Sequence, residues 1–188
     1  MSGRIAVIYT SDLGEIADVF ADAAAHLASQ VHTARLTEPD SVTDRAHPRA
    51  DLSLIEWADG IAFGTPSSDG CPAVELMAFL EASEPLWRSG RLYDKAVTVF
   101  TDEPEHIAPD SILHPLYDAL YRWGAVIVGP RHFELGWRNA AGDRQANSPE
   151  EPALAGARLR AAQHRAQRLT RLASVLAEEQ YRRQRLHL

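Results

Sequence analysis

The stretch that decides the fold is Ala58-Asp59-Gly60-Ile61-Ala62-Phe63-Gly64-Thr65-Pro66-Ser67-Ser68-Asp69-Gly70-Cys71-Pro72-Ala73-Val74-Glu75-Leu76-Met77-Ala78-Phe79-Leu80-Glu81-Ala82. Its apolar run from Ile61 to Phe63 predicts a buried strand, and turn-forming residues break that run from Gly64 to Gly70. A helix is expected from about Pro72, with one face made of Val74, Met77 and Leu80 or Phe79. In an open parallel sheet, a loop at the carboxyl end of a strand is where ligands bind.

The same alternation of strand and helix continues on both sides of this stretch. Further strands are predicted at residues 4–9, 30–36, 96–100 and 125–128, and helices at 16–29, 52–57 and 111–123. Gly124 stands where a glycine commonly ends a helix. Residues 37–50 are predicted to be an exposed loop, because they are rich in Pro, Asp and Thr. Five strands alternating with helices predict an α/β doubly wound sheet with right-handed crossovers.

A long helix is expected from about residue 149. Ser148-Pro149-Glu150-Glu151 is a capping box with Pro at the first helical position. We expect its arginines to face solvent or an acidic partner surface, and we assign residues 1–188 to a single domain. The apolar stripe of the helix is predicted to consist of Leu154, Ala161, Leu169, Leu172, Val175 and Leu176.

Composition excludes several classes of protein. The chain has 188 residues, of which 45% are hydrophobic and 24% charged, as in an ordinary globular domain. A net charge of -7 argues against nonspecific nucleic-acid binding, although eight Arg and four Glu give residues 150–188 a charge of +4 and leave -11 for the remainder. One cysteine fits a reducing compartment, and the first strand follows no signal-peptide pattern, so a cytoplasmic protein is expected. No apolar run approaches ~20 residues, so no membrane span is expected.

The stretch at 58–82 resembles the tryptophan-repressor-binding-protein (WrbA) type of flavoprotein. That family has an Ala-Asp-Gly strand, a Gly-[Ser/Thr]-Pro-Thr loop and a helix ending in Phe-Leu, and residues 85–95 are similar to its Leu-Trp…Gly-x-Leu…Lys run. The likeness covers about residues 4–130. It implies a flavodoxin-like sheet of order 2-1-3-4-5, FMN as cofactor and NAD(P)H as donor. It further implies two-electron reduction of a quinone or similar small acceptor, by a homodimer or homotetramer.

The resemblance assigns the phosphate of FMN to the loop after the first strand. The assigned residues are Ser11, Asp12, Leu13, Gly14, Glu15 and Ile16. A hydroxyl and several backbone N–H groups at a helix N-terminus hold an anion there. Glu15 stands where the family has His or Asn, and two carboxylates repel a phosphate. The alternative is a plain strand-to-helix turn whose acids favour the helix dipole.

Two further loops are assigned to the flavin ring and its ribityl chain. The assigned residues are Thr65, Pro66, Ser67, Ser68, Asp69, Gly70, Thr101, Asp102 and His106. In the family the loop at 101–109 contains a Gly-Gly pair, whereas this chain has three acids and two prolines there. Close backbone approach to a ligand is harder without glycine. This departure favours an alternative function, a flavodoxin-like protein that has lost FMN and acts as a binding or assembly partner, or on a biosynthetic intermediate.

Other candidate residues have simpler interpretations. Cys71 and His106 could form a nucleophilic pair, but a small residue filling space beside the cleft is the better interpretation of Cys71. The spacing of Glu103, Glu105 and His106 matches no strong metal motif, so no metal site is expected. Trp123 aligns with an active-site His of part of the family, or belongs to the core. Because FMN would carry the chemistry, no catalytic residue is assigned.

Overall fold

The computed structural model describes residues 3–10, 13–37, 47–66, 71–102, 110–129 and 151–186. Five parallel strands form one sheet of order β2-β1-β3-β4-β5, which confirms the predicted topology. The strands are β1 (Arg4–Tyr9), β2 (Gln30–Arg35), β3 (Gly60–Gly64), β4 (Ala96–Phe100) and β5 (Val126–Ile127).

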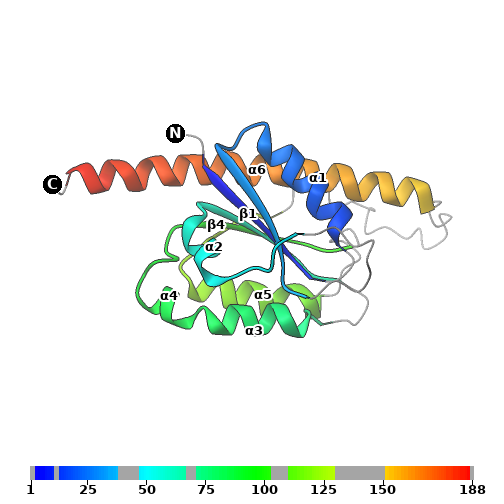
Figure 1. Cartoon of the computed structure of the whole chain (residues 1–188), viewed down its shortest axis with the longest axis horizontal. Helices are drawn as coiled ribbons and strands as arrows, with labels where there is room; N and C mark the ends of the chain where they lie inside the picture. Colours follow the sequence, from blue (N-terminus) through cyan, green and yellow to red (C-terminus); the bar gives the residue numbers. More distant parts are fainter. Residues whose placement is uncertain are drawn as a thin grey trace, which may run out of the picture.

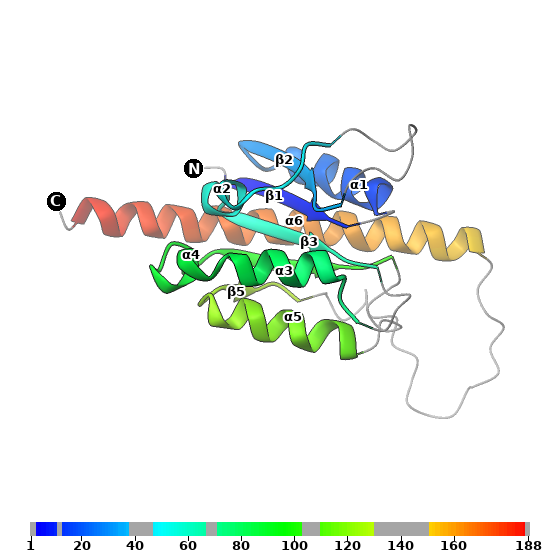
Figure 2. The same cartoon turned by 60° about the horizontal axis from the view of Figure 1, so that its bottom comes forward.

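Helices cover both faces of the sheet (Figures 1 and 2). They are α1 (Gly14–Ala25), α2 (Leu52–Trp57), α3 (Val74–Ala82), α4 (Glu84–Arg88), α5 (Asp110–Arg122) and α6 (Glu151–Leu186). The short α4 was not predicted, because five residues carry too little periodicity to be recognised. No described helix combines the length and the apolar composition that a membrane span needs.

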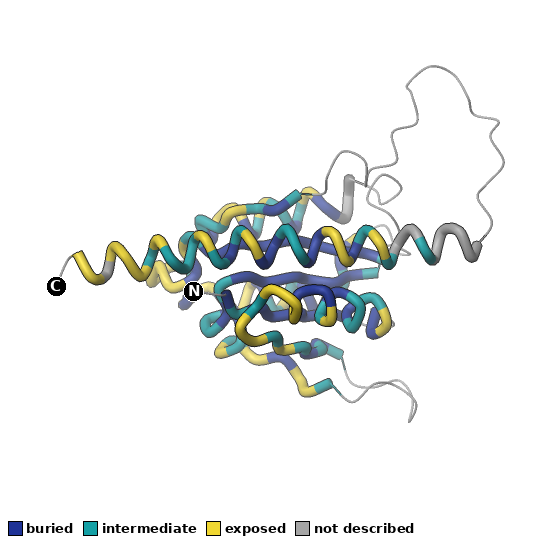
Figure 3. Tube along the Cα trace, turned by 90° about the horizontal axis from the view of Figure 1, so that it is seen from above, coloured by how far each residue is buried: buried dark blue, intermediate teal, exposed yellow. Residues whose placement is uncertain are grey.

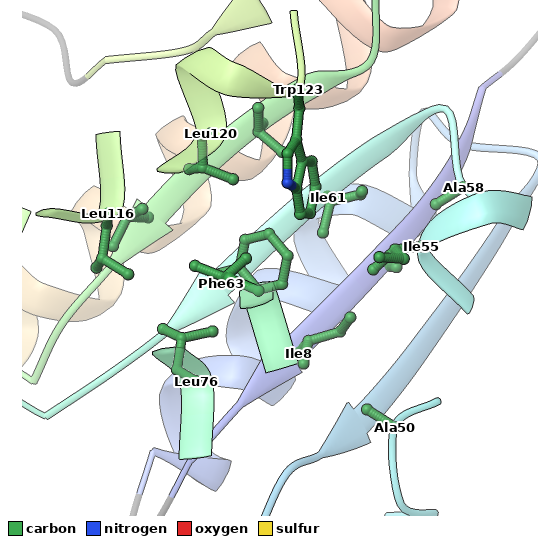
Figure 4. Close-up of a cluster of buried hydrophobic side chains, with 14 of the residues drawn as sticks. Ile8, Ala50, Ile55, Ala58, Ile61, Phe63, Leu76, Leu116, Leu120 and Trp123 are labelled. Atoms are coloured by element: carbon green, nitrogen blue, oxygen red, sulfur yellow. The ribbon is translucent and has the colours of Figure 1, made fainter. Parts of the chain in front are cut away.

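Each face of the sheet has its own hydrophobic core. β3 and β4 are buried along their whole length, because strands covered on both faces need no polar alternation. On the face of α2 to α5, Trp123 packs against Phe63 with ring centroids 5.9 Å apart, as Figure 4 shows. Trp123 is 2% exposed, so its assignment to the core is confirmed.

Two predicted helices need correction. The helix predicted at 16–29 is α1, which ends at Ala25, and Leu27 beyond it is 39% exposed. In α3 the buried residues are Leu76 and Leu80, whereas Val74 is 77% exposed. Val74 lies two residues, or about 200° of helical rotation, away from Leu76, and it therefore faces the opposite side.

The buried face of α6 also differs from the predicted stripe. Its buried apolar residues are Ala162, Ala166, Leu169 and Ala173, of which only Leu169 belongs to the predicted stripe, whereas Val175 is 64% exposed. Alanines let the helix lie close on the sheet, where a Cβ added at Gly60 would come within 2.8 Å of the Ala173 side chain. The C-terminal part of α6 extends beyond the sheet and is mostly exposed (Figure 3). Residues 148–150 of the predicted capping box lie outside the described residues.

The prediction that the α6 arginines face away from the sheet is wrong for two of them. Arg165 is 5% exposed and its Nη1 donates to the carbonyl of Val99. Arg168 donates to the carbonyl of Gly129 at 2.7 Å. Val99 lies near the carboxyl end of β4, and Gly129 follows β5 by two residues.

The end of the predicted loop at 37–50 is not exposed. The Arg35 N–H donates to the Pro48 carbonyl at 3.0 Å, and the Ala50 N–H donates to the Arg35 carbonyl at 2.8 Å. These two bonds make a short parallel bridge between Arg35 and Arg49 at the end of β2. Residues 38–46 of this prediction lie outside the described residues.

Candidate functional site

Three neighbouring strands, β1, β3 and β4, finish side by side at the carboxyl end of the sheet. The Thr10 N–H donates to the Gly64 carbonyl at 3.2 Å, and the Thr65 N–H donates to the Phe100 carbonyl at 3.1 Å. Thr10, Thr65 and Thr101, which open the three predicted loops, are all buried. α1, α3 and α5 begin at this same end of the sheet (Figure 2). The starts of the three loops therefore lie next to one another.

The second loop is anchored at both of its described ends. The Thr65 hydroxyl accepts a hydrogen bond from the Ala73 N–H at 2.9 Å, just before α3. A Cβ added at Gly64 would lie 2.5 Å from the Phe100 ring, so only glycine allows this close packing. Pro66 is half-buried, and residues 67–70 lie outside the described residues.

The N-terminus of α1 is the part of the first loop that can hold an anion. Leu13 is its N-cap residue and supplies no side-chain hydrogen bond. The first three N–H groups of a helix have no intrahelical acceptor, and within the described ranges those of Gly14, Glu15 and Ile16 find none elsewhere. They leave the positive end of the helix dipole open. Glu15 is exposed in this first turn, and Ser11 and Asp12 lie outside the described residues.

A cluster of three polar side chains lies beside this helix start. The Tyr9 hydroxyl and Nδ1 of His47 share a hydrogen bond of 2.8 Å, and Nε2 of His47 lies 3.3 Å from Oδ1 of Asp18. A Cβ added at Gly14 would lie 3.6 Å from the Tyr9 hydroxyl, which places that hydroxyl at the start of α1. Sequence reasoning missed this cluster, because His47 lies in a segment predicted to be exposed.

The third loop is described only at its start. Thr101 is buried and Asp102 is half-buried, whereas His106, Glu103 and Glu105 lie outside the described residues. Cys71 is exposed, so it does not fill space as predicted, and its pairing with His106 is untested. The described residues hold no group of three or more His, Cys, Asp or Glu that could bind a metal ion.

Comparison with known proteins finds relatives that align with most of the chain. No family model matches it. It is 30% identical over 183 residues to the "NAD(P)H dehydrogenase (quinone)" of Azorhizobium caulinodans, covering 82% of this chain and 92% of that protein. The protein of the same name from Syntrophus aciditrophicus is 29% identical over 186 residues, with the same coverages of 82% and 92%.

Solved structures show the same fold. The chain is similar to a flavodoxin, WrbA-like protein from Agrobacterium tumefaciens, with a TM-score of 0.62 and 21% identity over 92% of this chain and 98% of that one. An NADPH-quinone reductase from P. pentosaceus gives a TM-score of 0.53 at 14% identity, over 88% and 98%. Together with the strand order, these likenesses make the fold flavodoxin-like.

Proposed function

Because the chain belongs to the family of NAD(P)H dehydrogenases (quinone), with a WrbA-like flavodoxin fold, we propose that it is an FMN-dependent oxidoreductase. It takes electrons from NAD(P)H and reduces a quinone or a similar small acceptor. The observation that carries the proposal is the open N-terminus of α1, which lies beside the adjacent ends of β1, β3 and β4. Ligands of doubly wound sheets bind outside the carboxyl ends of the strands.

The phosphate is proposed to lie at the start of α1. The N–H groups of Gly14, Glu15 and Ile16 supply donors without a competing acceptor in the described residues. Ser11, Asp12 and Leu13 complete this loop in the proposal. The Tyr9 hydroxyl, held by His47, supports the same turn from the sheet side.

The flavin ring and ribityl chain are assigned to the other two loops. The proposed contacts come from Thr65, Pro66, Ser67, Ser68, Asp69, Gly70, Thr101, Asp102 and His106. When bound, FMN supplies the hydride and electron chemistry, and the chain binds and orients the reactants. The buried Thr65, bonded to the Ala73 N–H, fixes where the second loop leaves the sheet.

A second candidate function is favoured by the third loop. It has no glycine between Thr101 and Pro109, and Asp102 is half-buried at its start. A chain that had lost FMN would keep the fold and act as a binding or assembly partner, or on a biosynthetic intermediate. For either function we propose a cytoplasmic protein, because the single cysteine fits a reducing compartment. We also propose a homodimer or homotetramer, because the charge of +4 on residues 150–188 and of -11 on the remainder can complement each other between subunits.

An FMN titration of the wild type and Glu15→Asn tests the assignment of the phosphate. A partly exposed carboxylate within ~5 Å of the phosphate costs about 1 kcal/mol, so Glu15→Asn should lower the Kd roughly fivefold. Added salt should tighten wild-type binding through screening. Glu81→Gln is the matched control, because Glu81 is an exposed acid at the far end of α3. Fluorescence quenching of FMN measures the Kd of each variant.

The outcomes separate the two candidate functions. Tight wild-type binding that Glu15→Asn leaves unchanged would show that the phosphate does not lie beside Glu15. A colourless protein that FMN fails to reconstitute at any salt concentration would support the second function. Oxidation of NADH or NADPH with a quinone by the reconstituted protein is the activity expected of the first.

A further inference from the structure

His47 contacts both the end of β1 and the beginning of α1. Its Nδ1 shares a hydrogen bond of 2.8 Å with the Tyr9 hydroxyl, and its Nε2 lies 3.3 Å from Oδ1 of Asp18. The side chains of His47 and Asp18 are only 21% and 18% exposed, and Tyr9 is buried. The cluster lies beside Gly14, the first residue of α1, and therefore next to the N–H groups to which the phosphate is assigned.

The cluster is close enough to this helix start for charges to interact. A Cβ added at Gly14 would lie 3.6 Å from the Tyr9 hydroxyl, which is 2.8 Å from Nδ1 of His47. Asp18 follows Gly14 by four residues, so it lies on the same face of α1, one turn or about 6 Å further along. A charge on His47 or Asp18 and a phosphate at the helix start are thus separated by roughly one Debye length, ~10 Å at 0.1 M salt.

The two contacts of His47 fix which nitrogen carries the hydrogen in the neutral ring. A carboxylate only accepts hydrogen bonds, so the contact with Asp18 places the hydrogen on Nε2. Nδ1 is then the acceptor, and the Tyr9 hydroxyl donates to it. In this state Asp18 gives the cluster one negative charge. A proton added at Nδ1 removes that net charge and reverses the hydrogen bond, so that His47 donates to the Tyr9 oxygen.

We propose that His47 links binding of the FMN phosphate to proton uptake, so that the anion site at the start of α1 binds most tightly when His47 is protonated. This inference rests on the proposed function for the identity of the ligand. A phosphate with two negative charges is repelled by the Asp18 carboxylate, and much less by an Asp18–His47 pair whose charges cancel. By reciprocity, a bound phosphate raises the pH below which His47 is protonated.

The other charged or titratable groups around His47 in the described part of the chain keep their charge where a histidine titrates. These groups are Tyr9 of β1, Asp18 and Glu15 of α1, Arg35 of β2, and Arg49 on the same segment as His47. Carboxylates, tyrosine and arginine do not change charge between pH 6 and 8, whereas histidine does. The second proton of a phosphate also leaves near pH 6, so a variant without His47 is needed to separate the two contributions.

Binding of FMN and of riboflavin, which lacks the phosphate, at pH 6 and pH 8 tests the proposal. His47→Gln keeps a polar group near the position of Nε2 but takes up no proton. The ratio of the FMN Kd at pH 8 to that at pH 6 should be roughly fivefold larger in the wild type than in His47→Gln. For riboflavin the two proteins should give the same ratio. His26→Gln is the matched control and should behave as the wild type, because His26 is exposed at the other end of α1.

Proton NMR of the His47 imidazole provides a second measurement. Its signal is identified by its loss in His47→Gln. The midpoint of its pH titration should rise by about 0.7 of a pH unit, the same factor of five, when FMN or an excess of inorganic phosphate is added.

The outcomes separate this inference from the proposed function. FMN that binds without moving the His47 midpoint, or FMN ratios that are equal in the wild type and His47→Gln, would overturn the inference and leave the proposed function intact. A midpoint raised by inorganic phosphate, in a protein that FMN fails to reconstitute, would support the inference and count against the flavin function. A midpoint that responds to neither anion, in a protein that binds no FMN, would overturn both.

Discussion

Lys95 shows how burial sets the chemistry of one residue. It is the only lysine among the 19 lysines and arginines, and it is 8% exposed just before β4. Its Nζ donates to the carbonyls of Glu56, at 2.8 Å, and Ala58. Burial lowers the pKa of Lys95 from 10.5 to about 8, although the nearby Asp59 carboxylate opposes the shift. The group holds the end of α2 against β4.

The lowered pKa of Lys95 predicts how stability depends on pH. Between pH 8 and 10.5 the unfolded chain retains a proton that the folded chain has lost, so stability rises with pH. The rise due to Lys95 is about 3 kcal/mol. Urea unfolding across this range should show it in the wild type and lack it in Lys95→Met.

A direct measurement is possible because the chain has one lysine. Protein labelled with ¹³C-lysine should give a single side-chain signal that titrates near pH 8. Titration near 10.5 would contradict the structural account, because it would mean that Nζ is solvated.

At the scale of elements, the short β5 explains the buried arginine of α6. The Val128 N–H reaches the Val97 carbonyl at 2.7 Å, and the Phe100 carbonyl points to β3. The Val99 carbonyl therefore points towards β5, past the end of that strand, and Arg165 serves as its donor. α6 thus completes hydrogen bonding that the sheet leaves open.

Loss of the Arg165 guanidinium is expected to cost more than loss of an exposed one. Arg165→Met leaves the buried Val99 carbonyl without this donor, which should lower the free energy of unfolding by about 2 kcal/mol. Arg171→Met is the matched control on an exposed position of the same helix and should change it by less than about 0.5 kcal/mol. Equal effects in denaturant titrations would argue against this role of Arg165.

At the scale of the whole molecule, charge is divided between the sheet body and the long helix. Residues 150–188 carry +4 and the remainder -11. On the projecting part of α6, ion pairs join Arg182 to Glu178 at 3.0 Å and Arg183 to Glu179 at 3.2 Å. Pairs of this kind on an exposed helix contribute only about 0.3–0.5 kcal/mol. The positive charge of residues 150–188 and the negative charge of the remainder are therefore better suited to attraction between subunits than to raising the folding stability of one subunit.

Light scattering should accordingly give two or four times the mass of one chain at micromolar concentration and low salt. Complementary charges are screened by salt, so the mass should fall as the salt concentration rises towards 1 M. The mass of a single chain under low-salt conditions would contradict the proposed oligomer.

The residue pattern by itself predicted an α/β doubly wound sheet, and the strand order was implied by the resemblance to the WrbA type of flavoprotein. Buried runs such as Ile61 to Phe63, separated by turn residues and amphipathic helices, are typical of a parallel sheet with right-handed crossovers. The pattern also located the loop starts at Thr10 and Thr101, because each directly follows an apolar run, and placed the third at Gly64, which is the last residue of β3. These features depend on residues that are neighbours in the chain.

Only the tertiary structure decided contacts between distant residues. Tyr9 and His47 are 38 residues apart, and Arg165 lies 66 residues from Val99. A periodic pattern states that a residue is apolar or charged, but not which backbone group lies opposite it. For the same reason the predicted stripe of α6 included Val175, whereas the alanines that fit closely on the sheet form the buried face.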